Sequence, residues 1–299
     1  MTRYEKMMGR LAAGERILID GATGTEIERR GVPMLDDAWN GGGALSHPNI
    51  LRQVHEDYLR VGAEIVISNT FATSRHALAD AGEAAHFEAY NRRGVELAKE
   101  ARDRAGRPDA LVAGGISYWS WSGKHPALDT LRDGVTEQAG FMVDAGADLL
   151  MLEMMVDLER LMLTLEAART SGLPVWVGLS CKADASGKMI LWRGDPLDRV
   201  LGKLQDLDVP QVSIMHSEVE YVSGCLEVIE QNWAGPVGVY AHSARWVEHK
   251  CIFDDTISPA AYANYARSWL DRGAQMIGGC CGMGVNHIAA LKQMMTLRK

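Results

Sequence analysis

The sequence has few of the features that mark proteins of membranes, nucleic acids or the extracellular space. No apolar run approaches the roughly 20 residues that a membrane-spanning helix needs. Residues 1–21 carry scattered charges where a secretory signal would have an apolar segment, so we expect no such signal there. The 39 acidic residues outnumber the 31 basic ones, and the basic residues form no patch. Neither a membrane nor a nucleic acid is therefore expected as a partner.

Cysteine is scarce as well. Five cysteines in 299 residues, without an export signal, are typical of reduced thiols in a cytosolic protein, so we expect a cytoplasmic location. The chain also lacks linkers rich in Pro, Gly or Ser and tracts of low complexity. We therefore expect one domain over residues 1–299. The sequence leaves open whether the chain forms a homo-oligomer.

Eight apolar segments, each bounded by turn residues, are predicted to be strands. They are almost continuously hydrophobic, as expected for parallel strands that are buried on both faces. The segments are residues 16–20, 64–70, 111–117, 149–154, 175–181, 211–216, 237–242 and 276–281. Helical patterns separate most of them, at residues 49–63, 84–105, 129–147, 157–172 and 258–274. This alternation predicts a (β/α)8 TIM barrel, with an open doubly wound sheet as the alternative.

Every predicted strand ends in a polar or thiol side chain. In barrel enzymes the active site lies at the C-terminal ends of the strands. A buried strand has little reason to end in Glu or His unless the group faces a ligand or a partner. The residues at these ends are Asp20, Asn69, Ser117, Glu153, Ser180 with Cys181, His216, His242, and Cys280 with Cys281. We therefore expect a binding site at this end of the barrel.

The two adjacent cysteines in "IGGCCGMG", residues 277–284, are the most specific feature. Adjacent cysteines cannot easily bridge each other, but the glycines allow a tight turn in which both sulfurs face one point. Zinc binds thiolate and imidazole ligands, and a catalytic zinc keeps three protein ligands and one open position. Cys280, Cys281 and His216 are thus predicted to hold Zn²⁺. Phosphate binding by the glycine amides is an alternative that explains the glycines but not the thiols.

The chain resembles the zinc-dependent homocysteine S-methyltransferase family, which includes the enzymes that use betaine and S-methylmethionine. The segment with the two adjacent cysteines carries the resemblance. Further stretches agree with it at residues 18–31, 47–71, 91–102, 150–154 and 280–291. The resemblance implies a (β/α)8 barrel and the transfer of a methyl group to a thiol acceptor such as homocysteine.

The same resemblance implies roles for single residues. The family holds zinc with the two adjacent cysteines and with a third cysteine at the end of strand six, where this chain has His216. Asp20 and Gly21 on strand one and Glu153 on strand four would hold the amino-acid end of the acceptor. Two acidic side chains suit its ammonium group, so Asp20 and Glu153 are predicted to be catalytic as well as substrate-binding.

Further departures from the family pattern also lie at the strand ends, in "SYWSW" (117–121), in "AHSARW" (241–246) and at the residue after Glu153. They indicate altered ligands on a retained barrel. We also place Asn69 and His242 in the substrate site. Aromatic faces hold a cationic methyl donor well, although packing under long loops is the alternative reading. The aromatic residues of this predicted cage are Tyr118, Trp119, Trp121 and Trp246.

Together these features predict a zinc-dependent methyltransferase whose donor is a small onium compound, either a sulfonium or a quaternary ammonium. No cobalamin or folate module is expected in this chain, so we expect a direct donor, with a separate corrinoid protein as the alternative. A metal-dependent barrel hydrolase is a second hypothesis. It usually has a His-x-His pair on strand one, where this chain has Asp20 and Gly21. A zinc-less relative that only binds a ligand is the third.

Overall fold

The structure, a computed structural model, describes residues 1–243, 245–247, 250–252 and 256–297. Within residues 244–255 it describes only the backbone of two short strands. Trp246, one of the residues of the predicted aromatic cage, therefore has a side chain outside the described part of the chain.

Eight parallel strands form the central sheet, in the order β1-β12-β9-β8-β5-β4-β3-β2. A parallel bridge between Ile19 and Ile65 joins the two edges and closes the sheet into a barrel. This confirms the predicted (β/α)8 barrel, and the doubly wound alternative is wrong. The barrel strands are β1 (Ile17–Leu18), β2 (Ile65–Ile67), β3 (Leu111–Ile116), β4 (Leu149–Met155), β5 (Val175–Leu179), β8 (Val212–Glu218), β9 (Val237–His242) and β12 (Met276–Ile277).

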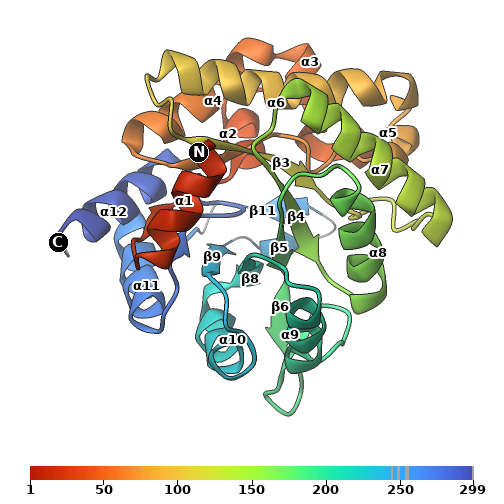
Figure 1. Cartoon of the computed structure of the whole chain (residues 1–299). Helices are drawn as coiled ribbons and strands as arrows, with labels where there is room; N and C mark the ends of the chain where they lie inside the picture. The colour runs from red at the N-terminus through yellow and green to blue at the C-terminus, as the bar shows by residue number, and fades with distance from the viewer. Residues whose placement is uncertain (244, 248–249, 253–255, 298–299) are drawn as a thin grey trace.

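A ring of helices surrounds the barrel (Figure 1). The five predicted helices are present, and their bounds differ from the expected ones by a few residues. Gly62 and Gly146 end two of them with φ angles of 117° and 88°, which turn the chain back toward the next strand. The ring consists of α4 (Pro48–Val61), α6 (Phe87–Arg104), α7 (Leu128–Ala145), α8 (Leu158–Arg169), α9 (Leu197–Asp206), α10 (Val219–Asn232), α11 (Pro259–Asp271) and α12 (Val285–Thr296).

Helix α1 (Arg3–Ala12) was not predicted, and it packs against the N-terminal ends of the strands. The guanidinium of Arg3 donates to the carbonyl of Pro108, just before β3, and pairs with Asp148, just before β4. The indole of Trp176, at the start of β5, donates to the hydroxyl of Tyr4. This end of the barrel is therefore covered, and the opposite end remains for a site.

Shorter elements lie in the segments that follow the C-terminal ends of the strands. Two antiparallel hairpins were not predicted, β6 (Cys181–Ala183) with β7 (Met189–Leu191) and β10 (Arg245–Val247) with β11 (Lys250–Ile252). The segments after β1 and β2 contain α2 (Thr23–Arg29), η1 (Asp36–Gly42), α3 (Gly43–Ser46), α5 (Arg75–Asp80) and η2 (Ala84–His86).

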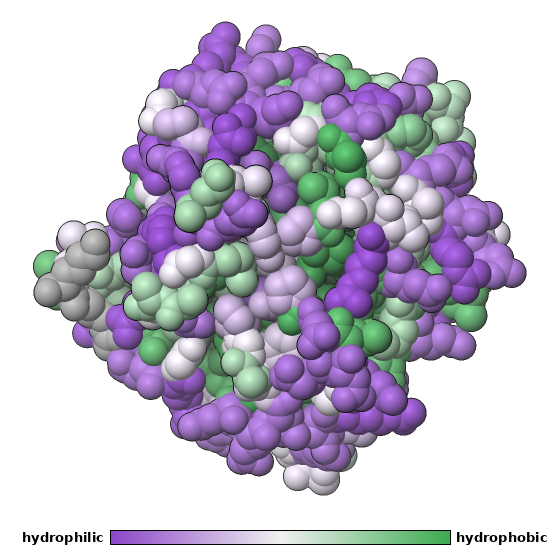
Figure 2. Space-filling view, viewed as in Figure 1, coloured by the Kyte–Doolittle hydropathy of each residue, from purple (hydrophilic) through white to green (hydrophobic). Residues whose placement is uncertain are grey.

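The core lies inside the barrel and between the strands and the helices. All residues of β3 and β4 are buried, as the continuous hydrophobicity of these segments predicts. Hydrophilic residues dominate the outer helices, whereas hydrophobic residues gather near the centre of the face shown in Figure 2. None of the described helices is long and apolar enough to cross a membrane.

Candidate active site

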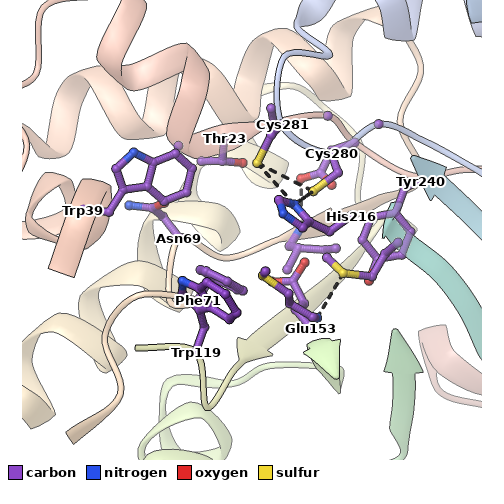
Figure 3. Close-up of a pocket in the computed structure, with 18 of the residues that line it drawn as sticks. Thr23, Trp39, Asn69, Phe71, Trp119, Glu153, His216, Tyr240, Cys280 and Cys281 are labelled. Atoms are coloured by element: carbon purple, nitrogen blue, oxygen red, sulfur yellow. Dashed lines mark hydrogen bonds between the residues drawn. The ribbon is translucent and has the colours of Figure 1, made fainter. Parts of the chain in front are cut away.

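A cavity of about 280 Å³ opens at the C-terminal ends of the strands. Its two sides differ in chemistry (Figure 3). We call one the strand-end side, because its residues follow or end barrel strands: Asp20, Glu153, Met215, His216, Tyr240, Cys280 and Cys281. We call the other the aromatic side, formed by Glu28, Asp36, Trp39, Phe71, Trp119 and Trp121. Gly21 and Asn69 also line the cavity.

His216, Cys280 and Cys281 converge on one point of the strand-end side. Nδ1 of His216 lies 3.6 Å from each of the two sulfurs, and the sulfurs are 3.9 Å apart. A tetrahedral zinc with bonds of about 2.3 Å to sulfur and about 2.0–2.1 Å to nitrogen would place its ligands about 3.8 Å (S···S) and about 3.5–3.6 Å (S···N) apart. The three donor atoms therefore fit the edges of a zinc tetrahedron.

Glycines allow the two cysteines to stand side by side. A Cβ at Gly278 would lie 2.7 Å from the carbonyl oxygen of Asp20, and one at Gly279 would overlap the side chain of Met283. Gly282 has a φ of 86°, a left-handed conformation that glycine adopts without strain. The glycine-rich segment recognised in the sequence is therefore a tight turn that only glycine fits.

The backbone of β8 is irregular where it presents His216. The pairing of β8 with β9 shifts between Met215 and Glu218, and His216 has a φ of 44°. A bulge of this kind re-aims a side chain, and a left-handed non-glycine residue is strained unless its surroundings hold it. The hydroxyl of Ser180 donates to the carbonyl of His216 over 2.7 Å and helps to hold it.

His216 is buried and neutral in this environment. Burial, and then the charge of neighbouring His242, lower the pKa of its imidazole. Neutral imidazole is the form that binds a metal. The ring of His242 packs against His216 with centroids 4.3 Å apart, and His242 is not among the residues that line the cavity. His242 thus packs behind the cluster of His216, Cys280 and Cys281 and does not line the cavity.

Asp20 and Glu153 place two buried carboxyl groups in the same cavity. Burial raises the pKa of Glu153 to about 8. Burial also raises the pKa of Asp20; the 2.9 Å hydrogen bond from the Ile67 amide opposes that rise, and the charge of Glu153 adds to it. A Cβ at Gly115 would lie 2.7 Å from Oε2 of Glu153, so glycine on β3 makes room for this carboxyl. None of the described residues lining the cavity is Lys or Arg, so the pair suits a cationic ligand group.

Gly21 and Asn69 hold the chain around these carboxyls. A Cβ at Gly21 would lie 2.9 Å from the hydroxyl of Tyr58, so only glycine fits after Asp20. The side-chain amide of Asn69 donates to the carbonyl of Asn40 over 2.8 Å and so ties the end of β2 to the segment after β1. Both residues therefore shape the cavity, whatever they contact in a bound ligand.

The aromatic side presents ring faces and two carboxylates. Trp121 contacts Trp39 and Phe71, with ring centroids 5.9 Å and 5.7 Å apart. Trp119 packs edge-on against Trp192, which lies outside the lining. One oxygen of Glu28 is buried and has no hydrogen-bond partner among the described residues. Rings and acidic groups together favour a cationic ligand.

Besides His242, Tyr118 and Cys181 were expected in or near the cavity and lie outside its lining. Tyr118 is buried outside the cavity lining, where its hydroxyl accepts hydrogen bonds from the amides of Val156 and Asp157. It therefore supports the chain after β4, and the structure does not bring it to the aromatic side. Cys181 begins β6 and is buried against Cys225 of α10, and the hydrogen bond with Cys225, followed by burial, raises the pKa of its thiol.

Sequence reasoning did not single out Phe71, Tyr240, Glu28 or Asp36. Tyr240 precedes His242 by two residues, and alternate residues of a strand share a face, so the predicted strand 237–242 contained the signal. Phe71 directly follows the predicted second strand. Glu28 and Asp36 lie in a segment for which no structure was predicted, and nothing in their spacing marks them.

Fold and site together define an enzyme-like barrel in which a cluster of two thiols and an imidazole shares one cavity with two buried carboxyls and the aromatic side. The model of the homocysteine S-methyltransferase family matches residues 17–295. The chain therefore belongs to this family, and it is an S-methyltransferase. The expected family and enzyme class are thereby confirmed, and membership argues against the hydrolase hypothesis.

Individual relatives are similar over almost the whole chain. Homocysteine S-methyltransferase 1 of Arabidopsis thaliana is 24% identical, with 92% of each chain covered. Selenocysteine methyltransferase of Astragalus bisulcatus is 26% identical, with 90% of this chain and 89% of the relative covered. The metallated crystal form of the homocysteine methyltransferase MmuM from Escherichia coli is 27% identical and has a TM-score of 0.77, with 93% of this chain and 96% of MmuM covered.

Proposed function

We propose that the chain binds one zinc ion through Nδ1 of His216 and the sulfurs of Cys280 and Cys281. With this zinc it would move a methyl group from a small onium donor to homocysteine or a related amino-acid thiol. The observation that carries the zinc assignment is the set of three separations, 3.6, 3.6 and 3.9 Å, that match a zinc tetrahedron. The metallated form of MmuM agrees with a metal in this family.

The ligand set determines the charge of the centre. Two cysteine thiolates offset the double positive charge of zinc, and a neutral His216 adds no further negative charge. A bound zinc would lower the pKa of the acceptor thiol, so that a thiolate is present at neutral pH. Neutral imidazole in place of a third thiolate leaves the acceptor sulfur more easily ionised but a weaker nucleophile, which suits a strongly activated donor.

Asp20 and Glu153 would bind the ammonium group of the acceptor. Both carboxyls are buried in a cavity without a described Lys or Arg, so an ammonium ion would compensate charge that is costly in the free protein. Relatives whose names specify homocysteine or selenocysteine act on amino acids with this group. These roles support an amino-acid thiol as the acceptor.

The aromatic side would hold the donor. Trp39, Phe71, Trp119 and Trp121 offer ring faces to a positive sulfur or nitrogen, and Glu28 and Asp36 add negative charge. In the reaction the acceptor thiolate attacks the methyl carbon and forms the new S–C bond. The bond from that carbon to the donor breaks, and its electron pair stays on the donor, which leaves as a neutral thioether or amine.

The test combines metal analysis with a donor screen. Reduced, zinc-supplemented protein should contain about one zinc per chain and should methylate homocysteine with a sulfonium or quaternary ammonium donor. His216→Cys should retain zinc, and His216→Ala should bind it much more weakly. Protein without bound metal would overturn the zinc proposal and favour the ligand-binding hypothesis, and metal-loaded protein active only with a methylated corrinoid protein would overturn the direct donor.

The cytoplasmic location, the homo-oligomer and the extent of one domain over residues 1–299 stay predictions. The role of Trp246 in the donor cage also stays a prediction, because its side chain lies outside the described residues.

A further inference from the structure

Tyr240 is a buried cavity residue to which the proposed chemistry assigns no role. It lies on β9, is only 2% exposed and lines the cavity. Its hydroxyl is buried and has no hydrogen-bond partner among the described residues. A buried hydroxyl without a partner is costly, and this one belongs to a residue that lines the space a ligand would fill.

The barrel makes room for this hydroxyl. A Cβ at Gly178 of β5 would lie 2.7 Å from the Tyr240 oxygen and 2.7 Å from Cγ of Met215. Any other residue at Gly178 would therefore displace the hydroxyl from the barrel interior. Gly115 makes room for the Glu153 carboxylate in the same way. Glycines thus make room for both polar groups, Gly115 on the strand next to that of Glu153 and Gly178 on a strand two positions from that of Tyr240.

The surroundings of Tyr240 are those of the acceptor site. Figure 3 shows Tyr240 on the same side of the cavity as Glu153, His216 and Cys280. Burial raises the pKa of its hydroxyl, and the charges of Glu153, Cys280 and Asp20 add to that rise. The hydroxyl is therefore protonated at neutral pH, and its oxygen lies in the field of both carboxyls.

An ammonium group has three N–H donors and needs three acceptors when it is buried. Asp20 and Glu153 account for two. We propose that the Tyr240 hydroxyl oxygen is the third acceptor for the ammonium group of the amino-acid thiol, so that Tyr240 is a substrate-binding residue that reads the amino group. This inference rests on the proposed function, because it takes an amino-acid acceptor as given. A hydrogen bond from Tyr240 to the Cys280 sulfur is the competing role.

Binding of two thiols to zinc-loaded protein separates these roles. L-Homocysteine carries the amino group, and 4-mercaptobutyrate has the same thiol chain and carboxylate without it. Hydrogen bonds to charged groups contribute about 1.5–3 kcal/mol, so Tyr240→Phe should weaken homocysteine binding about tenfold to a hundredfold in titration calorimetry. It should weaken 4-mercaptobutyrate binding less than about twofold. Zinc content should stay at the wild-type value.

Tyr262→Phe is the matched control. Tyr262 is also fully buried, but its hydroxyl donates to the carbonyl of Gly278 over 2.7 Å and is not in the cavity lining. This variant should have a lower melting temperature than wild type, and any change in binding should be the same for both thiols. Tyr240→Phe, by contrast, removes a hydroxyl without a partner and should leave the melting temperature of the free protein unchanged or slightly raised.

Each outcome decides one question. An equal loss for both thiols, or a loss of zinc in Tyr240→Phe, would overturn the proposed role and favour the contact with Cys280. Unchanged binding of homocysteine would overturn it as well. If wild-type protein binds both thiols equally well, the amino-acid acceptor itself fails, and that result is independent of Tyr240.

Discussion

The strand-end side and the aromatic side of the cavity are built from different parts of the barrel. Glu153 and His216 lie on strands and are only 8% and 4% exposed, and bulges in β4 and β8 aim them. Trp39, Trp119 and Trp121 come from segments that follow strands and are partly exposed. Rigid elements position groups more accurately than loops do.

This contrast follows the demands of the two proposed ligands. A metal and an ammonium group need donor atoms at defined distances, and the barrel strands and the tight glycine turn after β12 supply fixed positions. An onium methyl donor needs apolar and π-electron surface, which tolerates small shifts of a ring. Substitutions on the strand-end side should therefore cost more than substitutions on the aromatic side.

Cys280→Ser should have the largest effect, because it removes one of three proposed metal ligands. Changes in groups that only support ligands cost about tenfold to a hundredfold in metal affinity, and loss of a ligand should exceed that. We expect zinc content near zero by elemental analysis and no measurable methyl transfer. The circular dichroism spectrum should be retained, because the cluster lies at the mouth of the barrel.

Cys225→Ala provides the control for this change. Cys225 is buried in α10 beside Cys181 and does not line the cavity. This variant should lose some stability and keep its zinc. Stoichiometric zinc in Cys280→Ser would contradict the assigned ligand set.

Glu153→Gln should have the next largest effect, and it should appear in proton release. The pKa of Glu153 is raised to about 8, so the carboxyl is mostly protonated at pH 7 and must ionise to bind an ammonium group. When L-methionine, which has no thiol proton, binds, Glu153 should release close to one proton at pH 7 and fewer as the pH rises through about 8. Calorimetry in buffers of different ionisation enthalpy measures the release. The variant should bind about tenfold to a hundredfold more weakly and should release about one proton fewer than wild type at pH 7.

The same carboxyl should control part of the stability of the free protein. Its pKa in the folded chain, about 8, is raised above the ordinary value of 4.5, so the protonated group contributes stability that is fully present below about pH 4.5. That contribution is lost as the pH rises through about 8. The melting temperature of Glu153→Gln minus that of wild type should therefore be larger at pH 9 than at pH 4. An equal difference at both pH values would show that Glu153 is not perturbed.

The strand-end side could be predicted well from the sequence because strands have regular spacing. Once eight apolar segments were recognised, the ends of parallel strands had to meet at one end of the barrel. This reasoning placed Asp20, Glu153, His216 and Cys280 in one region, and the structure places all four in the cavity. The bulges that aim Glu153 and His216 could not be predicted, because they depend on packing between neighbouring strands.

The aromatic side was predicted less well because its residues come from the longer segments after the strands, where the regular spacing of a strand no longer fixes the direction of a side chain. Sequence position puts Tyr118 beside Trp119, but the chain turns Tyr118 inward to bind the backbone amides of Val156 and Asp157. Those amides are buried polar groups that need partners, and this need is not visible in the local sequence. Phe71 occupies the cavity in addition to the tryptophans.

Trp119→Ala should raise the KM for the donor more than the KM for the acceptor. A cation–π contact contributes about 0.5–2 kcal/mol, so the donor KM should rise from a few-fold to about thirtyfold. The acceptor KM should change by less than about twofold, as steady-state kinetics with each substrate varied would show. Trp119→Phe keeps a ring and should recover most of the loss. Equal changes in both KM values would contradict the separation of the two sides.

Glu28→Gln should have the smallest effect, because Glu28 lies on the aromatic side and is partly exposed. Its buried oxygen has no hydrogen-bond partner among the described residues, so the charge is available to a cationic donor. Exposed charge pairs contribute about 0.2–1 kcal/mol, so the donor KM should rise about 1.5-fold to fivefold, and less so at high salt.

Glu26→Gln tests whether this effect comes from the position of the charge. Glu26 lies on the same helix, α2, but it pairs with Arg29 and Arg30 and is outside the cavity lining. The substitution Glu26→Gln removes the same charge from the helix and should leave the donor KM unchanged. Inhibition by the neutral demethylated donor should be the same in wild type and in Glu28→Gln, because a neutral molecule gains nothing from the carboxylate. A loss of affinity for the neutral product, or an equal effect of Glu26→Gln, would show that Glu28 acts through the shape of the segment and not through its charge.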